Sequence, residues 1–140
     1  MSEFQIPKIY TDGSCLKNPG GASGWSYCFP GDKNTWLVSG GVRSSTNNRM
    51  ELKAVIEALK TVSGAKYEIN TDSMLTLKCA QGLWKRKSNL DLWKEYDVVS
   101  NDKTLYWKWV KAHNGDKFNE LVDHAARNEA KLQKNKNLAH

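Results

Sequence analysis

The chain has 140 residues, of which 39% are hydrophobic, so it is long enough to form one domain with its own core. Its formal net charge of +6 favours an anionic partner such as nucleic acid, although a charge of this size also serves ordinary solubility. Cys15, Cys28 and Cys79 have unrelated spacings that exclude a disulfide framework and a zinc pattern. With no signal sequence and no apolar run of ~18 residues, we expect a cytoplasmic protein that does not enter membranes.

Three strands joined by short turns are expected in the first third of the chain. Apolar residues that alternate with polar ones predict strands at 6–13, 24–29 and 35–42. Turn signals separate them, at Asn18-Pro19-Gly20-Gly21 and at Pro30-Gly31-Asp32. Connections this short favour an antiparallel meander.

Helices and strands alternate through the rest of the chain. The predicted elements are, in order, a helix at 48–62, a strand at 66–71, a helix at 73–82, a basic connection at 85–89, a helix at 91–99, a strand at 105–110 and a polar loop at 111–116. Within them, Trp93 and Trp107 are expected in the core. This order predicts a mixed α/β sheet with helices packed on it.

The last helix is predicted at 117–132. Its expected buried stripe consists of Leu121, Val122, Ala125, Ala126 and Leu132. From Gln133 onward the sequence is rich in Lys and Asn and has no core pattern, which predicts a disordered basic tail. The predicted organisation is therefore one domain at 1–132 and a tail at 133–140.

Two aspartates each follow a predicted strand. Asp12 ends the first strand and Asp72 ends the fourth, and sites in α/β sheets form just beyond the carboxyl ends of strands. If these two strands are parallel neighbours, both carboxylates emerge at one edge of the sheet. Taken singly, each has a structural explanation, because Asp before Gly is common in turns and Asp72 could cap a helix.

Glu51 and Asp123 each lie on a predicted helix. Asn48 and Glu51 have the spacing of a capping box, which would explain Glu51 without a functional role. Asp123 lies beside the apolar stripe of the last helix, where a charge is costly unless it reaches water, pairs with a basic side chain or binds a metal.

A convergence of these four acids predicts a metal site. Carboxylates at one spot repel each other and raise each other's pKa, and a divalent cation relieves that repulsion. All-oxygen ligands suit Mg²⁺ or Mn²⁺, and a pair of such ions can promote cleavage of a phosphodiester. In the polar loop, His113 is either an ordinary surface residue or a group for proton transfer.

The order of five sequence blocks resembles type 1 ribonuclease H. The blocks are Tyr10-Thr11-Asp12-Gly13-Ser14-Cys15 with Asn18-Pro19-Gly20-Gly21, Thr46-Asn47-Asn48-Arg49-Met50-Glu51-Leu52, Thr71-Asp72-Ser73, Trp109-Val110-Lys111-Ala112-His113-Asn114-Gly115, and Asn119-Glu120-Leu121-Val122-Asp123. Each block supplies an acid or the histidine that the family has at that place, and together they cover residues 6 to about 130.

The resemblance implies a five-stranded mixed sheet, three antiparallel strands then parallel ones, with helices on both faces. It implies an endonuclease that hydrolyses the RNA strand of RNA–DNA hybrids to 3′-hydroxyl and 5′-phosphate products by a two-metal-ion mechanism. Mg²⁺ is the implied cofactor, with Mn²⁺ as a substitute. The partner is the hybrid duplex, and we expect a monomer without an obligate protein partner.

The resemblance also implies residue roles. The metal-binding catalytic acids are Asp12, Glu51, Asp72 and Asp123, and His113 assists proton transfer or product release. The hybrid's minor groove is read by Cys15, Asn18, Asn47 and Asn48, whose polar groups would contact 2′-hydroxyls and base edges. Thr46 matches a phosphate-binding position on the DNA side, and Gly13 would let the backbone approach the RNA strand closely.

The chain departs from the family pattern at two places. Many bacterial members have Gln where this chain has Met74, and the thioether cannot replace its hydrogen bonds. Many members also insert a basic helix and loop where this chain has only Trp84-Lys85-Arg86-Lys87-Ser88-Asn89. We expect Lys85, Arg86 and Lys87 either to bind the hybrid or to form a solvated turn, and Trp84 either to stack on the DNA strand or to pack beneath the turn.

The sequence leaves three alternative functions open. A hybrid-binding module that kept the fold would bind without cleaving, although all four acids and the histidine are present. A 3′–5′ exonuclease of related fold usually has a second acid two residues after the first, whereas Asp12 is followed by Gly13-Ser14. A ribonuclease H domain from a reverse transcriptase fits the missing basic insertion, whereas Met1 just ahead of the first strand favours a standalone protein.

Overall fold

Five strands and four helices make up the described part of the chain, residues 6–139 of a computed structural model. In chain order they are β1 (Lys8–Cys15), β2 (Ser23–Phe29), β3 (Trp36–Val42), α1 (Asn47–Lys60), β4 (Lys66–Thr71), α2 (Met74–Ala80), α3 (Leu90–Ser100), β5 (Thr104–Trp109) and α4 (Lys117–Leu138). Each predicted element is present, with ends shifted by a few residues.

The strands form one mixed sheet in the order β3-β2-β1-β4-β5. The meander is confirmed, because β1 pairs antiparallel with β2 and β2 pairs antiparallel with β3. On the other side of β1, the β1–β4 and β4–β5 pairs are parallel. The predicted mixed sheet is therefore confirmed, and β1 lies at its centre with β4 running in the same direction beside it.

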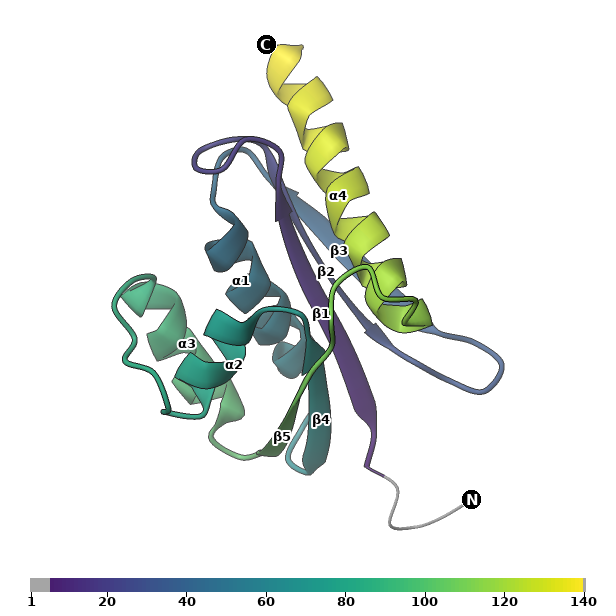
Figure 1. Ribbon diagram of the computed structural model, residues 1–140, viewed down its shortest axis with the longest axis vertical. Helices are drawn as coiled ribbons and strands as arrows, with labels where there is room; N and C mark the ends of the chain where they lie inside the picture. The colour runs from purple at the N-terminus through teal and green to yellow at the C-terminus, as the bar shows by residue number, and fades with distance from the viewer. Residues whose placement is uncertain (1–5, 140) are drawn as a thin grey trace.

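Helices cover both faces of the sheet (Figure 1), as the resemblance implies. One face packs against α1 and the helices beside it, around a core that includes Leu52, Ile56 and Ile69. The opposite face packs against α4, where Val122 is fully buried. A Cβ atom at Gly24 of β2 would lie 2.2 Å from the carbonyl oxygen of Ala126, so α4 rests directly on the strand backbone.

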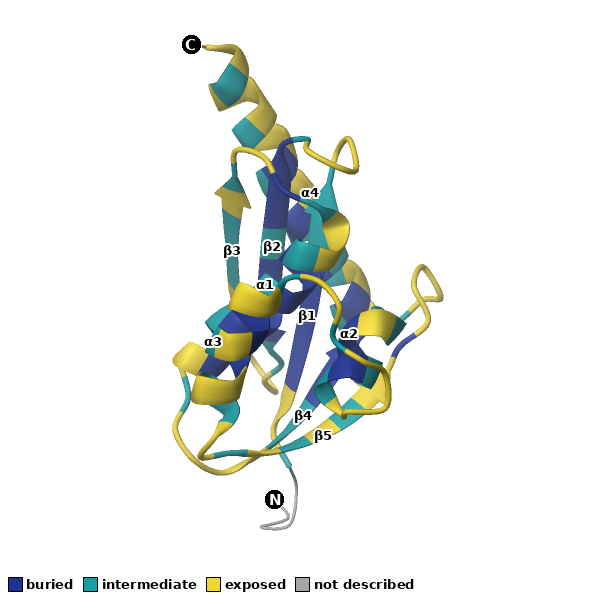
Figure 2. Cartoon of the chain, turned by 90° about the vertical axis from the view of Figure 1, so that its left-hand side faces the viewer, coloured by how far each residue is buried: buried dark blue, intermediate teal, exposed yellow. Residues whose placement is uncertain are grey.

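Burial follows these layers (Figure 2). Buried residues make up half of β1 and most of β2, whereas every residue of the edge strands β3 and β5 is intermediate or exposed. Trp93 is buried and Trp107 packs against the same core, which confirms both predictions. Cys15, Cys28 and Cys79 are free thiols, as their spacing predicts. None of the helices in the described ranges is long and apolar enough to cross a membrane.

The structure corrects the prediction for the end of the chain. The last helix continues through the expected tail as far as Leu138, and His140 lies outside the described residues. Gln133 donates a side-chain hydrogen bond to Asn137 at 2.9 Å, and the Asn137 amide donates to the carbonyl of Arg43 at 3.0 Å. These polar residues continue the packed face of the helix, which is why an apolar pattern does not reveal it.

The buried stripe of α4 is also narrower than predicted. It consists of Asn119, Val122, Ala126 and Ala130. Leu132 is 46% exposed, so its expected place in the stripe is wrong, and Leu121 and Ala125 are only partly buried. Because the residues that face β2 are small, the helix can lie close to the sheet.

Candidate active site

Asp12 lies inside β1 rather than at its end. The strand continues to Cys15, and Asp12 is opposite Ser26 of β2. On its other side β1 pairs with β4 in a register that joins Tyr10 to Asn70. Two residues further along each parallel chain, Asp12 and Asp72 therefore arrive at the same place, as the strand argument predicted.

Glu51 points at β1 from the second turn of α1. The helix is capped by Thr46, whose hydroxyl oxygen accepts a hydrogen bond from the Arg49 N–H at 3.2 Å. The capping-box explanation of Glu51 is therefore wrong. Its buried carboxylate instead accepts a hydrogen bond from the backbone N–H of Gly13, which ties the helix to the strand.

The structure shows a packing reason for glycine at position 13. A Cβ atom there would lie 2.4 Å from the backbone nitrogen of Glu51 and 2.4 Å from the carbonyl carbon of Met50. Real Cβ atoms do not approach backbone this closely, so only glycine lets α1 reach β1 here. The missing side chain thus serves the placement of Glu51.

Three of the four predicted acids meet at one point. Carboxylate oxygens of Asp12, Glu51 and Asp72 all lie within 4.8 Å of one another. Asp123 of α4 lines the same cleft, whose volume is about 510 Å³. The site therefore takes one acid each from β1, α1, the end of β4 and α4, which lie far apart in the sequence.

Burial and mutual repulsion perturb the two innermost acids. Burial raises the pKa of Asp12, a hydrogen bond with Glu51 opposes this rise, and the charges of Asp72 and Asp123 add to it. Burial also raises the pKa of Glu51 well above its ordinary value, and the neighbouring Asp12 and Asp72 raise it further. The cluster is thus too negative to be fully ionised without a compensating cation.

Asp123 is held by a basic side chain and faced by the loop histidine. Arg127, one helical turn later, lies 2.9 Å from its carboxylate, and Nδ1 of His113 lies 3.9 Å from the same oxygen. His113 has a left-handed backbone with φ of 54°, and 70% of its side chain is exposed. A basic partner was one of three alternatives expected for Asp123, and the i,i+4 spacing of Arg127 was the signal that could have identified it.

The residues expected to read the minor groove surround the cleft. Gly13, Cys15, Asn47 and Asn48 line it directly, and the Asn18 side chain accepts a hydrogen bond from the Asn47 N–H at 3.1 Å. Thr46 lies just outside, as the helix cap already described. Other lining residues were not assigned to the site from the sequence, and these are Ser14, Ser73 and Leu75. Met74 also lines the cleft, so the departure at this position falls within the site.

The short basic connection lies beside the cleft and divides into two parts. Arg86 has a guanidinium 4.2 Å from the Trp93 ring, and its Nη1 donates to both carboxylate oxygens of Asp97 at 2.9 and 3.0 Å. Its Nε also donates to the carbonyl of Cys79 at 3.2 Å. The guanidinium is therefore held by contacts within the protein, which disfavours one of the two alternatives for Arg86, direct binding of the hybrid.

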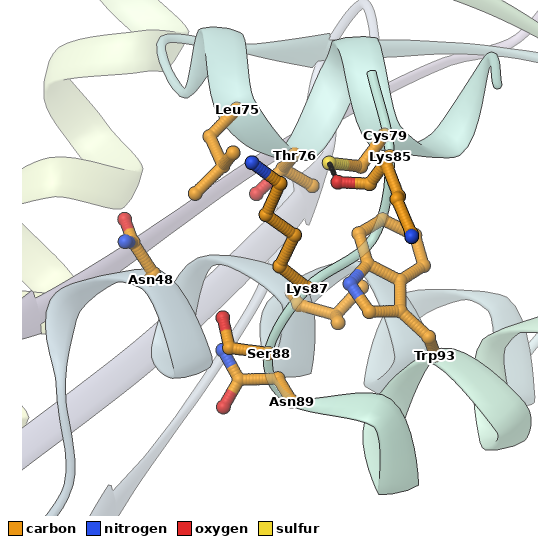
Figure 3. A pocket seen from close by; sticks show the side chains of 10 residues that line it. Asn48, Leu75, Thr76, Cys79, Lys85, Lys87, Ser88, Asn89 and Trp93 are labelled. Carbon is orange, nitrogen blue, oxygen red and sulfur yellow. Dashed lines mark hydrogen bonds between the residues drawn. The ribbon is translucent and has the colours of Figure 1, made fainter. Parts of the chain in front are cut away.

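The two lysines of this connection line a small pocket of about 90 Å³ (Figure 3). Lys87 extends across it toward Leu75 and Thr76, and Lys85 also lines it. Asn48 and Leu75 are shared with the acidic cleft, so the pocket and the cleft adjoin. Trp84 is 47% exposed, which favours the stacking role over packing beneath the turn.

The acidic cluster fits a divalent metal. It offers several carboxylate oxygens within the reach of one ion, and hard oxygen ligands are those that Mg²⁺ and Mn²⁺ prefer. The raised pKa values of Asp12 and Glu51 are the electrostatic mark of a site that lacks a compensating charge of its own. Asp123 is the fourth candidate ligand from across the cleft.

Comparisons with known proteins agree with this geometry. The RNase H family model matches residues 5–131. A ribonuclease H of Neorickettsia sennetsu is 39% identical, over 87% of this chain and 91% of the relative. Another, of Wolbachia sp. subsp. Drosophila simulans, is 41% identical over 91% and 96%. The structure of LC11-RNase H1 in complex with an RNA/DNA hybrid has a TM-score of 0.72 and 24% identity, covers 87% and 97% of the two chains, and supports the fold. The chain therefore belongs to the ribonuclease H family.

Proposed function

We propose that this chain is a metal-dependent endonuclease that hydrolyses the RNA strand of RNA–DNA hybrids. The observation that carries the proposal is the meeting of Asp12, Glu51 and Asp72 in a cleft that Asp123 also lines. Membership of the ribonuclease H family supports the same reaction and the same substrate. Its members depend on divalent metal ions, and the acidic cluster of this chain provides the ligands for them.

Mg²⁺ is the proposed cofactor, with Mn²⁺ as a substitute and two ions per site when substrate is present. Asp12, Glu51, Asp72 and Asp123 would hold them. Bound ions of this kind lower the pKa of a water and stabilise charge on the phosphodiester. The products would be a 3′-hydroxyl and a 5′-phosphate, because water attacks the phosphorus and the RNA 3′-oxygen leaves.

The protein contributes positioning and one proton-transfer group. The hydrogen bond from Gly13 to Glu51 and the register of β1 with β4 fix three carboxylates before substrate binds, which reduces the reorganisation that the reaction requires. His113 lies on an exposed loop beside Asp123, and we assign proton transfer at the cleft rim to its imidazole.

The rim of the cleft supports recognition of the hybrid. The side chains of Asn47 and Asn48 are exposed beside the acids, as a role at 2′-hydroxyls and base edges requires. The Asn18 side chain joins the loop after β1 to the start of α1, so the two groove-reading segments are held as one surface. The Cys15 thiol lies 3.4 Å from the Ser45 carbonyl, which supports the same surface.

The small pocket of Figure 3 is the proposed site for the DNA backbone on the other side of the cleft. Lys85 and Lys87 bring two positive charges to it, and the exposed Trp84 offers a ring for stacking on a sugar or base. Arg86 would then act indirectly, by holding the connection against α3. We further propose that the enzyme works as a cytoplasmic monomer without an obligate protein partner.

The test is a cleavage assay on one end-labelled RNA in three forms, namely hybridised to DNA, paired with RNA, and single-stranded. Each form is incubated with Mg²⁺ and with EDTA. Internal cuts confined to the hybrid and to Mg²⁺ are expected. Stepwise shortening from the 3′ end would indicate an exonuclease instead, and a hybrid that is bound but left uncut would indicate a binding module.

A further inference from the structure

A second groove lies behind the loop that borders the acidic cleft. Its volume is about 400 Å³, and it runs between the loop after β1, the end of β3 and the last turns of α4. We call it the C-terminal groove, and its lining residues are Leu16, Lys17, Gly20, Gly21, Ala22, Arg43, Lys134, Asn137 and Leu138. None of the activities assigned to the acidic cleft uses it.

The charged residues that line the groove are all basic. Lys17, Arg43 and Lys134 come from three separate segments, and no acidic side chain is among the described residues that line it. Other basic residues, such as Arg49 and Arg127, lie within 3 Å of a carboxylate. Within residues 6–139, no ion pair to an acid is found for any of the three groove cations, so their charges are available to an anionic ligand.

The groove adjoins the proposed substrate cleft. Ser14 and Cys15 line the cleft, and the next two residues, Leu16 and Lys17, line the groove. Hydrogen bonds hold the ridge between them, from the Gly20 N–H to the Ser45 carbonyl at 2.8 Å and from the Ser44 hydroxyl to the Gly20 carbonyl. A polyanion that enters the cleft therefore meets the groove on the far side of a fixed ridge.

The last turns of α4 are fixed where they form the wall of the groove. The Asn137 amide donates to the Arg43 carbonyl at 3.0 Å, so the helix end and the end of β3 are joined. Lys134 and Leu138 lie on the same side of the helix as Asn137, one turn apart, and all three line the groove. The helix beyond Leu132 thus builds a surface rather than a loose tail.

We infer that the C-terminal groove binds the sugar–phosphate backbone of the same nucleic acid at some distance from the scissile bond. This inference rests on the proposed function and extends the footprint of the substrate beyond the acidic cleft. The phosphates lie against Lys17, Arg43 and Lys134, and the sugars lie against Leu16 and Leu138. An acidic peptide could satisfy the same charges, but adjacency to the cleft favours nucleic acid.

The test uses a double variant and a matched control. Arg43→Ala/Lys134→Ala removes two groove cations, and Lys131→Ala/Lys136→Ala removes two exposed cations of α4 that do not line the groove. Affinity is measured by fluorescence anisotropy in EDTA, so that binding is tested whether or not the chain cleaves. The probes are hybrids of about 8 and about 24 base pairs, over a range of salt concentrations.

The groove variant is expected to bind the long hybrid about 5- to 20-fold more weakly, with a salt slope lower by about 1 to 2, and to bind the short hybrid normally. The control variant should lose far less affinity for the long hybrid. Equal losses in the two variants, or an equal loss on both lengths, would overturn the inference. Wild-type protein that binds neither hybrid would instead contradict the proposed function as well.

A final experiment distinguishes nucleic acid from protein as the ligand of the C-terminal groove. The probe is a labelled peptide of alternating Asp and Leu residues. Peptide binding that the groove variant loses, with unchanged affinity for the long hybrid, would make the groove a protein-docking surface and overturn the nucleic-acid assignment. Equal melting temperatures of both variants are expected, and a fall confined to the groove variant without loss of affinity would assign its cations to stability alone.

Discussion

The Asp12 carboxylate is buried beside other carboxylates. This arrangement suits metal binding, but it lowers the stability of the metal-free fold when the acids are ionised. Only 3% of the residue is exposed, and its nearest acidic neighbours are Glu51 and Asp72. Because burial and repulsion raise the pKa of Asp12 in the folded protein, the folded state binds a proton that the unfolded chain releases near pH 4. The cluster therefore stabilises the fold at low pH, and that stability is lost as the pH rises toward the folded-state pKa.

Asp12→Asn should accordingly stabilise the metal-free protein at neutral and higher pH. We expect a gain of roughly 1 to 3 kcal/mol, or several degrees in melting temperature, because a buried charge and its repulsion are removed. At pH 4 the gain should shrink, since the wild-type cluster is then protonated. Thermal unfolding in EDTA from pH 4 to pH 8 measures this, and a variant destabilised at pH 8 would refute the electrostatic account.

Single residues of the site could be predicted from the sequence where a motif places them. Asp12 and Asp72 follow from strand positions, and the sequence blocks add Glu51 and Asp123. The sequence did not reveal why Gly13 is glycine, because the close approach of α1 to β1 is a tertiary contact. The contacts of Arg86 with Asp97 and Trp93 could not be predicted either, because they are also tertiary contacts.

Among the elements, the connection between α2 and α3 bears most on how the substrate is held. Arg86 anchors it by stacking on Trp93 and by its contacts with Asp97 and the Cys79 carbonyl. Lys85 and Lys87 flank this anchor and line the pocket beside the cleft. One short segment thus combines a fixed residue with two cations that face the proposed DNA strand.

Mutations of the two lysines and of Arg86 should have different effects. Lys85→Ala/Lys87→Ala should raise KM for the hybrid about 3- to 10-fold and reduce its salt dependence, with the melting temperature unchanged. Arg86→Ala should lower stability by about 1 to 2 kcal/mol, because it removes a stacked, partly buried guanidinium. Steady-state kinetics and thermal unfolding check both, and an unaltered KM in the lysine variant would assign Lys85 and Lys87 to a solvated turn.

The ends of helices and strands could be predicted where apolar periodicity marks them. They could not be predicted where polar residues form the packed face. The three other helices and the five strands follow their predicted ranges to within a few residues, whereas α4 extends to Leu138. Gln133 and Asn137 hold its end through side-chain hydrogen bonds that a hydrophobic pattern does not report. The extension matters for function, because it forms one wall of the C-terminal groove.

At the scale of the whole molecule, the acidic site exists only in the folded chain. Its ligands come from β1, α1, the end of β4 and α4, and α4 packs on the opposite face of the sheet from α1 (Figure 1). A cation bound there is therefore linked to folding, since the unfolded chain offers no comparable cluster. The mixed topology is what brings these elements together around Asp12 of β1.

Mg²⁺ should therefore raise the melting temperature. At ten times its dissociation constant a ligand stabilises by about 1.4 kcal/mol, which corresponds to about 5 °C for a protein of this size. Thermal unfolding over a Mg²⁺ titration at constant ionic strength measures the shift. Asp72→Asn is the control, and it should reduce this shift. A melting temperature that does not change with Mg²⁺ would contradict a preformed site.

We propose that the buried carboxylates carry out the hydrolysis of hybrid RNA. This proposal is tested most directly by single-turnover cleavage of a labelled hybrid with saturating wild-type or Asp12→Asn protein in Mg²⁺, with hybrid affinity measured alongside. We expect a rate at least about 10³-fold lower in the variant, with binding retained, because transition-state stabilisation is lost while the binding surface is intact. A variant that cleaves the hybrid within about tenfold of the wild-type rate would contradict it.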